Sequence, residues 1–135
     1  MTHDEFIGQV QQRARLASRG AAEQATRATL ETLGERLSKG AAENLAAQLP
    51  PEIGEHLRRA ASGTGAHIDL EDFFARVTQR EATGVDEPQA VFHARSVLEV
   101  VAEATTGNLL RKLQEQLPPE YSRLFSSGST GRMPS

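Results

Sequence analysis

The sequence predicts an all-α protein in which two tandem helical repeats, of about three to four helices each, pack into one helical-bundle-like body. Apolar residues recur at helical spacing along the chain, and no stretch shows the alternation of a half-buried strand. The pentapeptide QLPPE occurs at residues 48–52 and again at residues 116–120, which sets an offset of 68 residues. A repeat at a fixed period is typical of a chain whose units stack to share one core.

The similarity between the two copies extends beyond the pentapeptide. Residues 30–52 and 98–120 share nine of 23 positions, and two glutamates of the first copy recur in the second. Between the copies lies a Gly-rich stretch, and the chain ends in a run of small polar residues. The expected organisation is a first helical repeat at 1–60, a Gly-rich linker at 61–68, a second helical repeat at 69–126 and a disordered tail at 127–135.

Helix signals in the first repeat follow one another in chain order. Thr2 and Glu5 have the spacing of a capping box, and Ser38 is placed to cap a third, shorter helix. The apolar positions of the three helices are Phe6, Ile7, Val10 and Ala14; then Ala22, Thr26, Thr29, Leu30, Leu33 and Leu37; then Ala41, Ala42, Leu45 and Leu49. Each set recurs every three or four residues, like the buried face of an amphipathic helix.

The second repeat carries the same kinds of signal. Its apolar positions are Phe73, Phe74 and Val77; then Ala90, Ala94, Val97, Leu98 and Val101; then Leu109, Leu110, Leu113 and Leu117. The expected boundary residues are Asp69 as the first cap, Gly84 as the end of that helix, Asp86 and Pro88 at the next start, and Thr105 or Thr106 as the third cap.

The pentapeptide itself predicts a corner between two helices. Leu49 and Leu117 are expected to be the last core residues of their helices, because a residue before proline is pushed out of helical geometry. The second proline suits the first turn of a new helix, where its missing N–H costs nothing. The glutamate that follows complements the helix dipole.

Composition excludes several function classes. The net charge is −3, and the basic and acidic counts are eight and eight in residues 1–62 and seven and ten in residues 63–135. Neither half is a basic patch, so we expect no nucleic-acid binding as the main task. The absence of cysteine excludes disulfides and thiolate metal sites. The acidic N-terminus lacks the apolar run of a secretory signal, and no stretch resembles a membrane span, so we expect a cytoplasmic protein that binds no membrane.

The duplicated glutamates are the sharpest chemical lead. Glu31, Glu35, Glu99 and Glu103 form two pairs one helical turn apart, and four glutamates on facing helices could hold a di-metal site. Such sites normally add a Glu-x-x-His pair, which this sequence lacks. We therefore favour a solvated helix face, expect all four carboxylates on the exposed side, and expect no tightly bound metal. The arginines expected to neutralise them are Arg27, Arg36 and Arg95.

The histidines are scattered and match no metal-binding spacing. His93 lies beside an apolar stripe and is interpreted as a partly buried, hydrogen-bonded residue. His67 precedes a helix and is interpreted as part of a linker. His56, with Arg58 and Arg59, could meet a phosphate or a nucleic acid, but this cluster lacks the strand and the lysine of a phosphate-binding loop. The sequence therefore assigns no catalytic, cofactor-binding or metal-binding residue and implies no cofactor.

Three segments together resemble an uncharacterised bacterial family, domain of unknown function 2267. They are HARSVL at 93–98, the turn TGN at 106–108, and QLPPEYSRLF at the end of the second copy. The stretch ATLETLGERLSKGAAENLAAQLPPE of the first copy fits the same pattern, although the turn before the last helices is less acidic than in the family. The resemblance implies two helical repeats and a bacterial origin. It supplies no activity and no catalytic residue.

These observations favour a non-catalytic helical binding or scaffold module that works through helix-face protein–protein contacts or self-association. The alternative is a small-ligand or metal-dependent enzyme with a carboxylate site between the two repeats, formed by the four duplicated glutamates. An enzyme is the less favoured of the two. A cleft lined by carboxylates without salt partners would favour the alternative, and an exposed apolar groove would favour the binding module.

Overall fold

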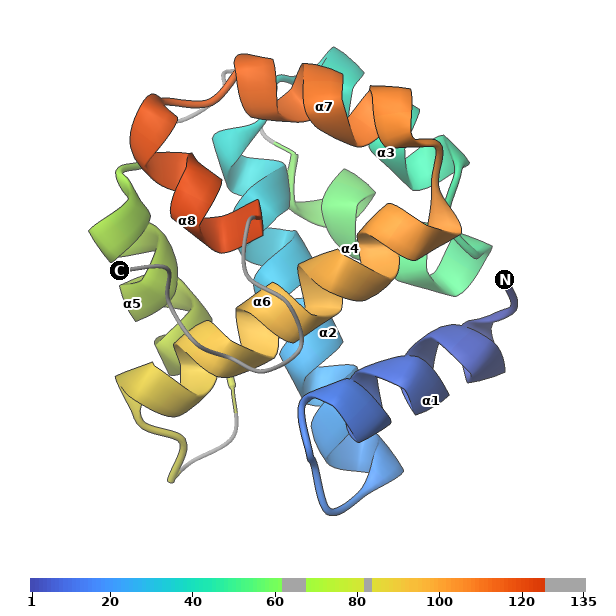
Figure 1. Cartoon of the computed structure of the whole chain (residues 1–135), viewed down its shortest axis with the longest axis vertical. Coiled ribbons are helices and arrows are strands. Elements are labelled where there is room, and N and C mark those ends of the chain that lie inside the picture. The colour runs from blue at the N-terminus through green and yellow to red at the C-terminus, as the bar shows by residue number, and fades with distance from the viewer. Residues whose placement is uncertain (62–67, 82–83, 126–135) are drawn as a thin grey trace.

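The computed structural model describes residues 1–61, 68–81 and 84–125, and all regular secondary structure in them is helical (Figure 1). This confirms the predicted all-α class. The helices are α1 (His3–Arg13), α2 (Arg19–Arg36), α3 (Lys39–Ala47), α4 (Pro51–Ala60), α5 (Leu70–Arg80), α6 (Glu87–Ala104), α7 (Gly107–Glu115), the 3₁₀ helix η1 (Pro119–Tyr121) and α8 (Ser122–Phe125). Most of the predicted linker, with His67, and the whole predicted tail lie outside the described residues.

Short polar side chains begin most of the helices, as the sequence predicts. Thr2 and Glu5 form the predicted capping box at α1, and Asp86 forms a second box with Gln89 at α6. Of the two candidate caps of α7, Thr106 accepts from the backbone N–H of Leu109. The remaining side-chain caps are Ser18 at α2, Ser38 at α3 and Asp69 at α5. Each cap satisfies a backbone donor that the first helical turn leaves free and stabilises the helix by about 1 kcal/mol.

Both copies of the pentapeptide form corners between helices. Pro51 is the first residue of α4 and Pro119 the first residue of η1, which confirms the predicted corner. Leu49 and Leu117 are both buried, at 6% exposure each. They lie two residues beyond the ends of α3 and α7, so the expectation that they belong to those helices is wrong. The turn into the corner already begins one residue before each leucine.

The connection between α5 and α6 differs from the prediction in one detail. We expected Gly84 to end α5, but that helix ends at Arg80 and Glu81 is its C-cap. Gly84 lies further along, with a φ of +97°, which glycine adopts without steric cost. The glycine therefore serves the connection rather than the helix end.

The long helices α2 and α6 form the centre of the molecule (Figure 1). α1 packs against both of them, and α5 also packs against both, while α4 packs on α2 and α8 on α6. Buried apolar side chains from both halves form one core. The bounds of α2 and α3 recur in α6 and α7 at the offset of 68 residues, although the duplication itself stays a prediction.

Two glycines allow α4 to approach its neighbours closely. A Cβ atom on Gly34 of α2 would lie 2.6 Å from the carbonyl oxygen of Leu57, and one on Gly54 of α4 would lie 2.6 Å from that of Ala46. Both distances are shorter than a side chain tolerates, so the absence of a side chain sets the spacing between these helices. Within the described residues, no helix is both long and apolar enough to cross a membrane.

Candidate functional site

The duplicated glutamates lie in ion pairs that join helices far apart in the sequence. On α2, Glu35 pairs with Arg80 of α5 at 2.9 Å and with Arg76 at 3.3 Å. Glu31 lies 3.8 Å from Arg80 and 3.6 Å from Arg59 of α4. The hydrogen bond from Arg80 holds the pKa of Glu35 below its ordinary value. These carboxylates therefore act as anchors for α5 and α4.

The second pair of glutamates has the same arrangement on α6. Arg13, in the last turn of α1, lies 2.8 Å from Glu99 and 2.5 Å from Glu103. The Arg13 side chain is 18% exposed, so this contact is only partly screened by solvent. α1 is thereby tied to α6, as α5 is tied to α2.

This arrangement corrects two expectations about the glutamates. Within the described part of the chain, their ion pairs join them to arginines of α1, α4 and α5. Arg95 is buried in the core, and the guanidinium of Arg36 lies over the Tyr121 ring, 5.6 Å from its centre. Of the four, only Glu103 is exposed, because α1 and α5 cover the faces that carry the others. Among the described residues, no three His, Cys, Asp or Glu side chains are grouped so that they could hold a metal ion.

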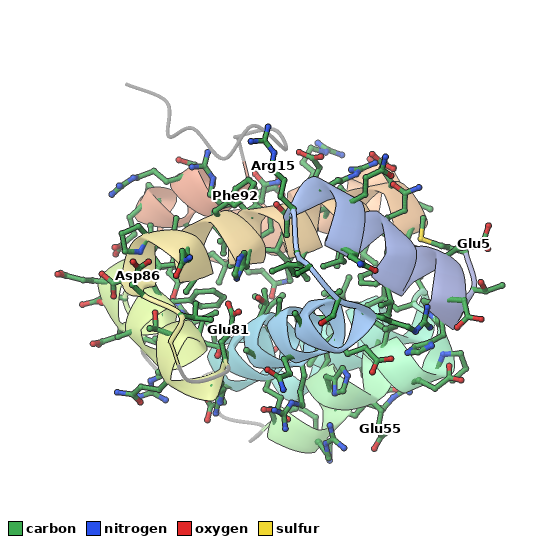
Figure 2. The ribbon with its side chains drawn as sticks, turned by 90° about the horizontal axis from the view of Figure 1, so that it is seen from below. Glu5, Arg15, Glu55, Glu81, Asp86 and Phe92 are labelled. Carbon is green, nitrogen blue, oxygen red and sulfur yellow. The ribbon has the colours of Figure 1, made fainter. Side chains whose placement is uncertain are left out.

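His93 is hydrogen-bonded, as predicted, and it is buried rather than partly buried. Its Nδ1 atom lies 2.8 Å from Oε2 of Glu81, and the two side chains are 8% and 3% exposed. Figure 2 shows Glu81 directed into the body of the protein, whereas the Glu55 side chain points outward. The Glu81 carboxylate, at the end of α5, thus holds the His93 side chain of α6 in place and links the two helices.

The basic cluster on α4 is also engaged by neighbouring side chains. Arg58 pairs with Glu43 of α3 at 3.0 Å, and Arg59 lies 2.7 Å from Nδ1 of His56. Burial and the charge of Arg59 lower the pKa of His56. Residues 62–67 of the Gly-rich stretch, which follows this cluster in the sequence, lie outside the described residues.

Two surface grooves occupy matching places in the two halves of the chain. The first groove, of ≈ 440 Å³, lies between α1, α2 and α4, with Ile7 and Ile53 at its floor. Its polar lining includes His3, Glu23, Arg27, Glu52 and His56. The second groove, of ≈ 530 Å³, lies between α5, the start of α6, and η1 with α8. It is lined by Leu70, Phe74, Pro88 and Val91 and by Glu71, Glu87, Glu120 and Arg123.

The linings of the two grooves correspond at four positions. At the offset of 68, the shared lining positions are His3 and Glu71, Gly20 and Pro88, Glu23 and Val91, and Glu52 and Glu120. Sequence reasoning did not find either groove, because each is lined by several helices and no single helix shows a motif. The 68-residue offset of the repeat is the sequence signal that could have indicated that the two grooves are related.

The fold and these sites define a helical protein with two surface grooves. The duplicated carboxylates form ion pairs between its helices. A family model described as "Uncharacterized conserved protein (DUF2267)" matches residues 3–124, and the chain belongs to this family. The match confirms the resemblance recognised in the sequence. A search among curated proteins found no match to the chain.

Proposed function

We propose that the protein is a non-catalytic helical binding or scaffold module of the bacterial cytoplasm, which contacts a protein partner or a second copy of itself through helix faces. In this proposal the two halves are copies of one helical unit. Each copy presents one groove at the N-terminal ends of its helices.

The observation that carries the proposal is the apolar lining of the second groove. Leu70 and Phe74 form its floor, Val91 is half-buried, and Pro88 is exposed at its edge. An apolar floor inside a polar rim is the usual anatomy of a protein–protein contact. An exposed apolar groove was also the feature expected to distinguish a binding module from an enzyme.

The enzyme alternative receives less support from the same coordinates. It required the four duplicated glutamates as free acids, bases or metal ligands between the two repeats. All four form ion pairs with arginines, and these pairs hold helices together. For Glu35 the hydrogen bond from Arg80 lowers the pKa, which makes this carboxylate a poorer proton acceptor.

Site-specific photo-crosslinking in the native cells tests the proposal. A benzophenone amino acid at Val91, in the second groove, should give a covalent adduct with one defined protein or with a second copy of the chain. The same amino acid at Gln114, exposed on α7, is the control. The same amino acid at Gln24 probes the first groove. If neither Val91 nor Gln24 gives an adduct, the result counts against a binding module. Stoichiometric iron, manganese or zinc that is lost in Glu35→Gln and Glu103→Gln would favour the enzyme.

A further inference from the structure

The floor of the second groove is held rigidly from below. The Phe74 ring meets the Phe73 ring edge-to-face at 6.0 Å, and Phe73 meets Tyr121 in the same way at 5.8 Å. The Tyr121 hydroxyl donates a hydrogen bond to the carbonyl oxygen of Ile68. Edge-to-face aromatic pairs favour a defined geometry. A partner that enters the groove therefore meets a preorganised apolar surface and loses little free energy in ordering it.

The rim of the second groove is acidic. Glu71 and Glu87 are exposed in the first turns of α5 and α6, and neither forms an ion pair with another described residue. Glu120 is fixed in place, because its Oε1 accepts a hydrogen bond from the backbone N–H of Leu70 at 3.2 Å. Arg123 is the basic member of the lining. Three carboxylates against one guanidinium leave this rim negative.

Helix starts often carry glutamates, because the carboxylate complements the helix dipole. The first half of the chain shows that a helix start does not need an acid at the positions that line the groove. At the equivalent positions of α1 and α2, His3 replaces Glu71 and Arg19 replaces Glu87. α1 has Asp4 and Glu5 in its first turn, neither of which lines the first groove, and α2 has no acidic residue in its first turn. Glu71 and Glu87 make the lining of the second groove more acidic than that of the first, in which Glu23 and Glu52 stand with Arg27.

We infer that the second groove docks a short segment of a protein partner in which an apolar side chain is flanked by lysine or arginine. The apolar side chain packs on Leu70, Phe74 and Val91, and the basic side chains meet Glu71, Glu87 and Glu120. A groove of ≈ 530 Å³ is within the size range of sites that bind short segments or small ligands. The inference rests on the proposed binding function and adds the chemistry of the partner.

Selection of short random peptides displayed on phage, against the full chain, tests this chemistry. We expect the enriched peptides to combine an apolar residue with neighbouring lysine or arginine. A labelled synthetic copy should bind more weakly as salt is raised, because exposed charge pairs are screened. In Glu71→His/Glu87→Arg, which copies the residues at the equivalent positions of the first half, its Kd should rise about tenfold or more, equivalent to about 1.4 kcal/mol. Val91→Asn should also weaken binding.

Glu55→Arg/Glu115→Gln is the matched control, since it makes the same change in formal charge at exposed positions outside both grooves. Its Kd should match that of the unmodified protein. Glu87→Gln serves as a milder variant if arginine at the start of α6 disturbs folding, which circular dichroism reports. A selection without enrichment, acidic consensus peptides, or equal binding to both double variants would overturn the inference. The crosslinking experiment at Val91 and Gln24 tests the proposed binding function independently of the peptide selection.

Discussion

Arg13 of α1 donates a hydrogen bond to Glu99 of α6 at 2.8 Å, across 86 positions of sequence. The pair has a counterpart in the other half, where Arg80 of α5 meets Glu35 of α2 at 2.9 Å. In both cases the first helix of one half is tied to the long helix of the other. The carboxylates that the sequence duplicates therefore connect the two halves.

A double-mutant cycle on Arg13 and Glu99 measures this connection. We expect Arg13→Met and Glu99→Gln each to lower the free energy of unfolding, with a coupling energy of about 0.5–2 kcal/mol, because both side chains are partly buried. Arg19 and Asp4 are the control, since that pair is exposed and should couple by less than about 0.5 kcal/mol. Urea denaturation of the unmodified protein and the six variants gives both coupling energies. Equal coupling in the two cycles would contradict an anchoring role.

Gly54→Ala should destabilise the fold. The new Cβ atom would lie 2.6 Å from the Ala46 carbonyl oxygen, so α4 must move away from α3. We expect a loss of about 1–3 kcal/mol, which exceeds the gain of about 1 kcal/mol that alanine brings to a helix interior. Gly8→Ala is the control, because no atom lies within 4 Å of its Cβ position and the variant should be more stable than the parent. Thermal unfolding of both variants tests whether Gly54→Ala lowers the stability and Gly8→Ala raises it.

Arg15→Gly should stabilise the protein. Arg15 follows the C-cap of α1 with a φ of 55°, and its N–H and that of Leu16 donate to Gln12 and Gln11 in the pattern of a Schellman motif. Glycine adopts this left-handed conformation without the clash of a Cβ atom, so we expect a gain of about 1 kcal/mol. Arg15→Ala removes the same charge but keeps the Cβ atom. A chemical-denaturation midpoint no higher in the glycine variant than in the alanine variant would count against this explanation.

Leu49→Ala and Leu117→Ala should each cost about 2–5 kcal/mol, the usual range for a buried leucine. Each side chain fills the inner side of a proline corner. Gln116→Ala, at an exposed neighbouring position, should change stability by less than about 0.5 kcal/mol. The denaturation midpoints of the three variants test the comparison. Small shifts in both leucine variants would mean that the corners are not part of the core.

The titration of Tyr121 should separate the folded from the unfolded protein. Burial raises the pKa of Tyr121 from 10.0 to about 12. The unfolded chain therefore loses this proton first as pH rises, so the stability contributed by Tyr121 is complete below pH about 10 and is lost between about 10 and about 12. Tyrosinate absorbance reports it directly, because the chain has one tyrosine and no tryptophan. A midpoint near 10 in protein that retains its helical circular dichroism would disprove the prediction, and Tyr121→Phe gives the baseline.

The family match and the all-helical fold agree with what the sequence alone predicts. Helix caps such as Thr2 and Asp86, and the proline corners, depend on residues within a few positions of one another. Their physics is local, so their spacing in the sequence is sufficient evidence. The same holds for the buried leucines, because a repeat of three or four residues marks one face of a helix.

Tertiary structure alone decided what the polar side chains contact. Glutamates one turn apart can be solvated, can bind a metal, or can meet an arginine from another helix, and the sequence does not distinguish these outcomes. Arg76 reaches Glu35 over 41 residues and Arg13 reaches Glu99 over 86. The grooves depend in the same way on where several helices meet. Periodicity identifies the face that a helix buries, but the packing of all the helices determines which neighbour covers it and which side chains remain in a groove.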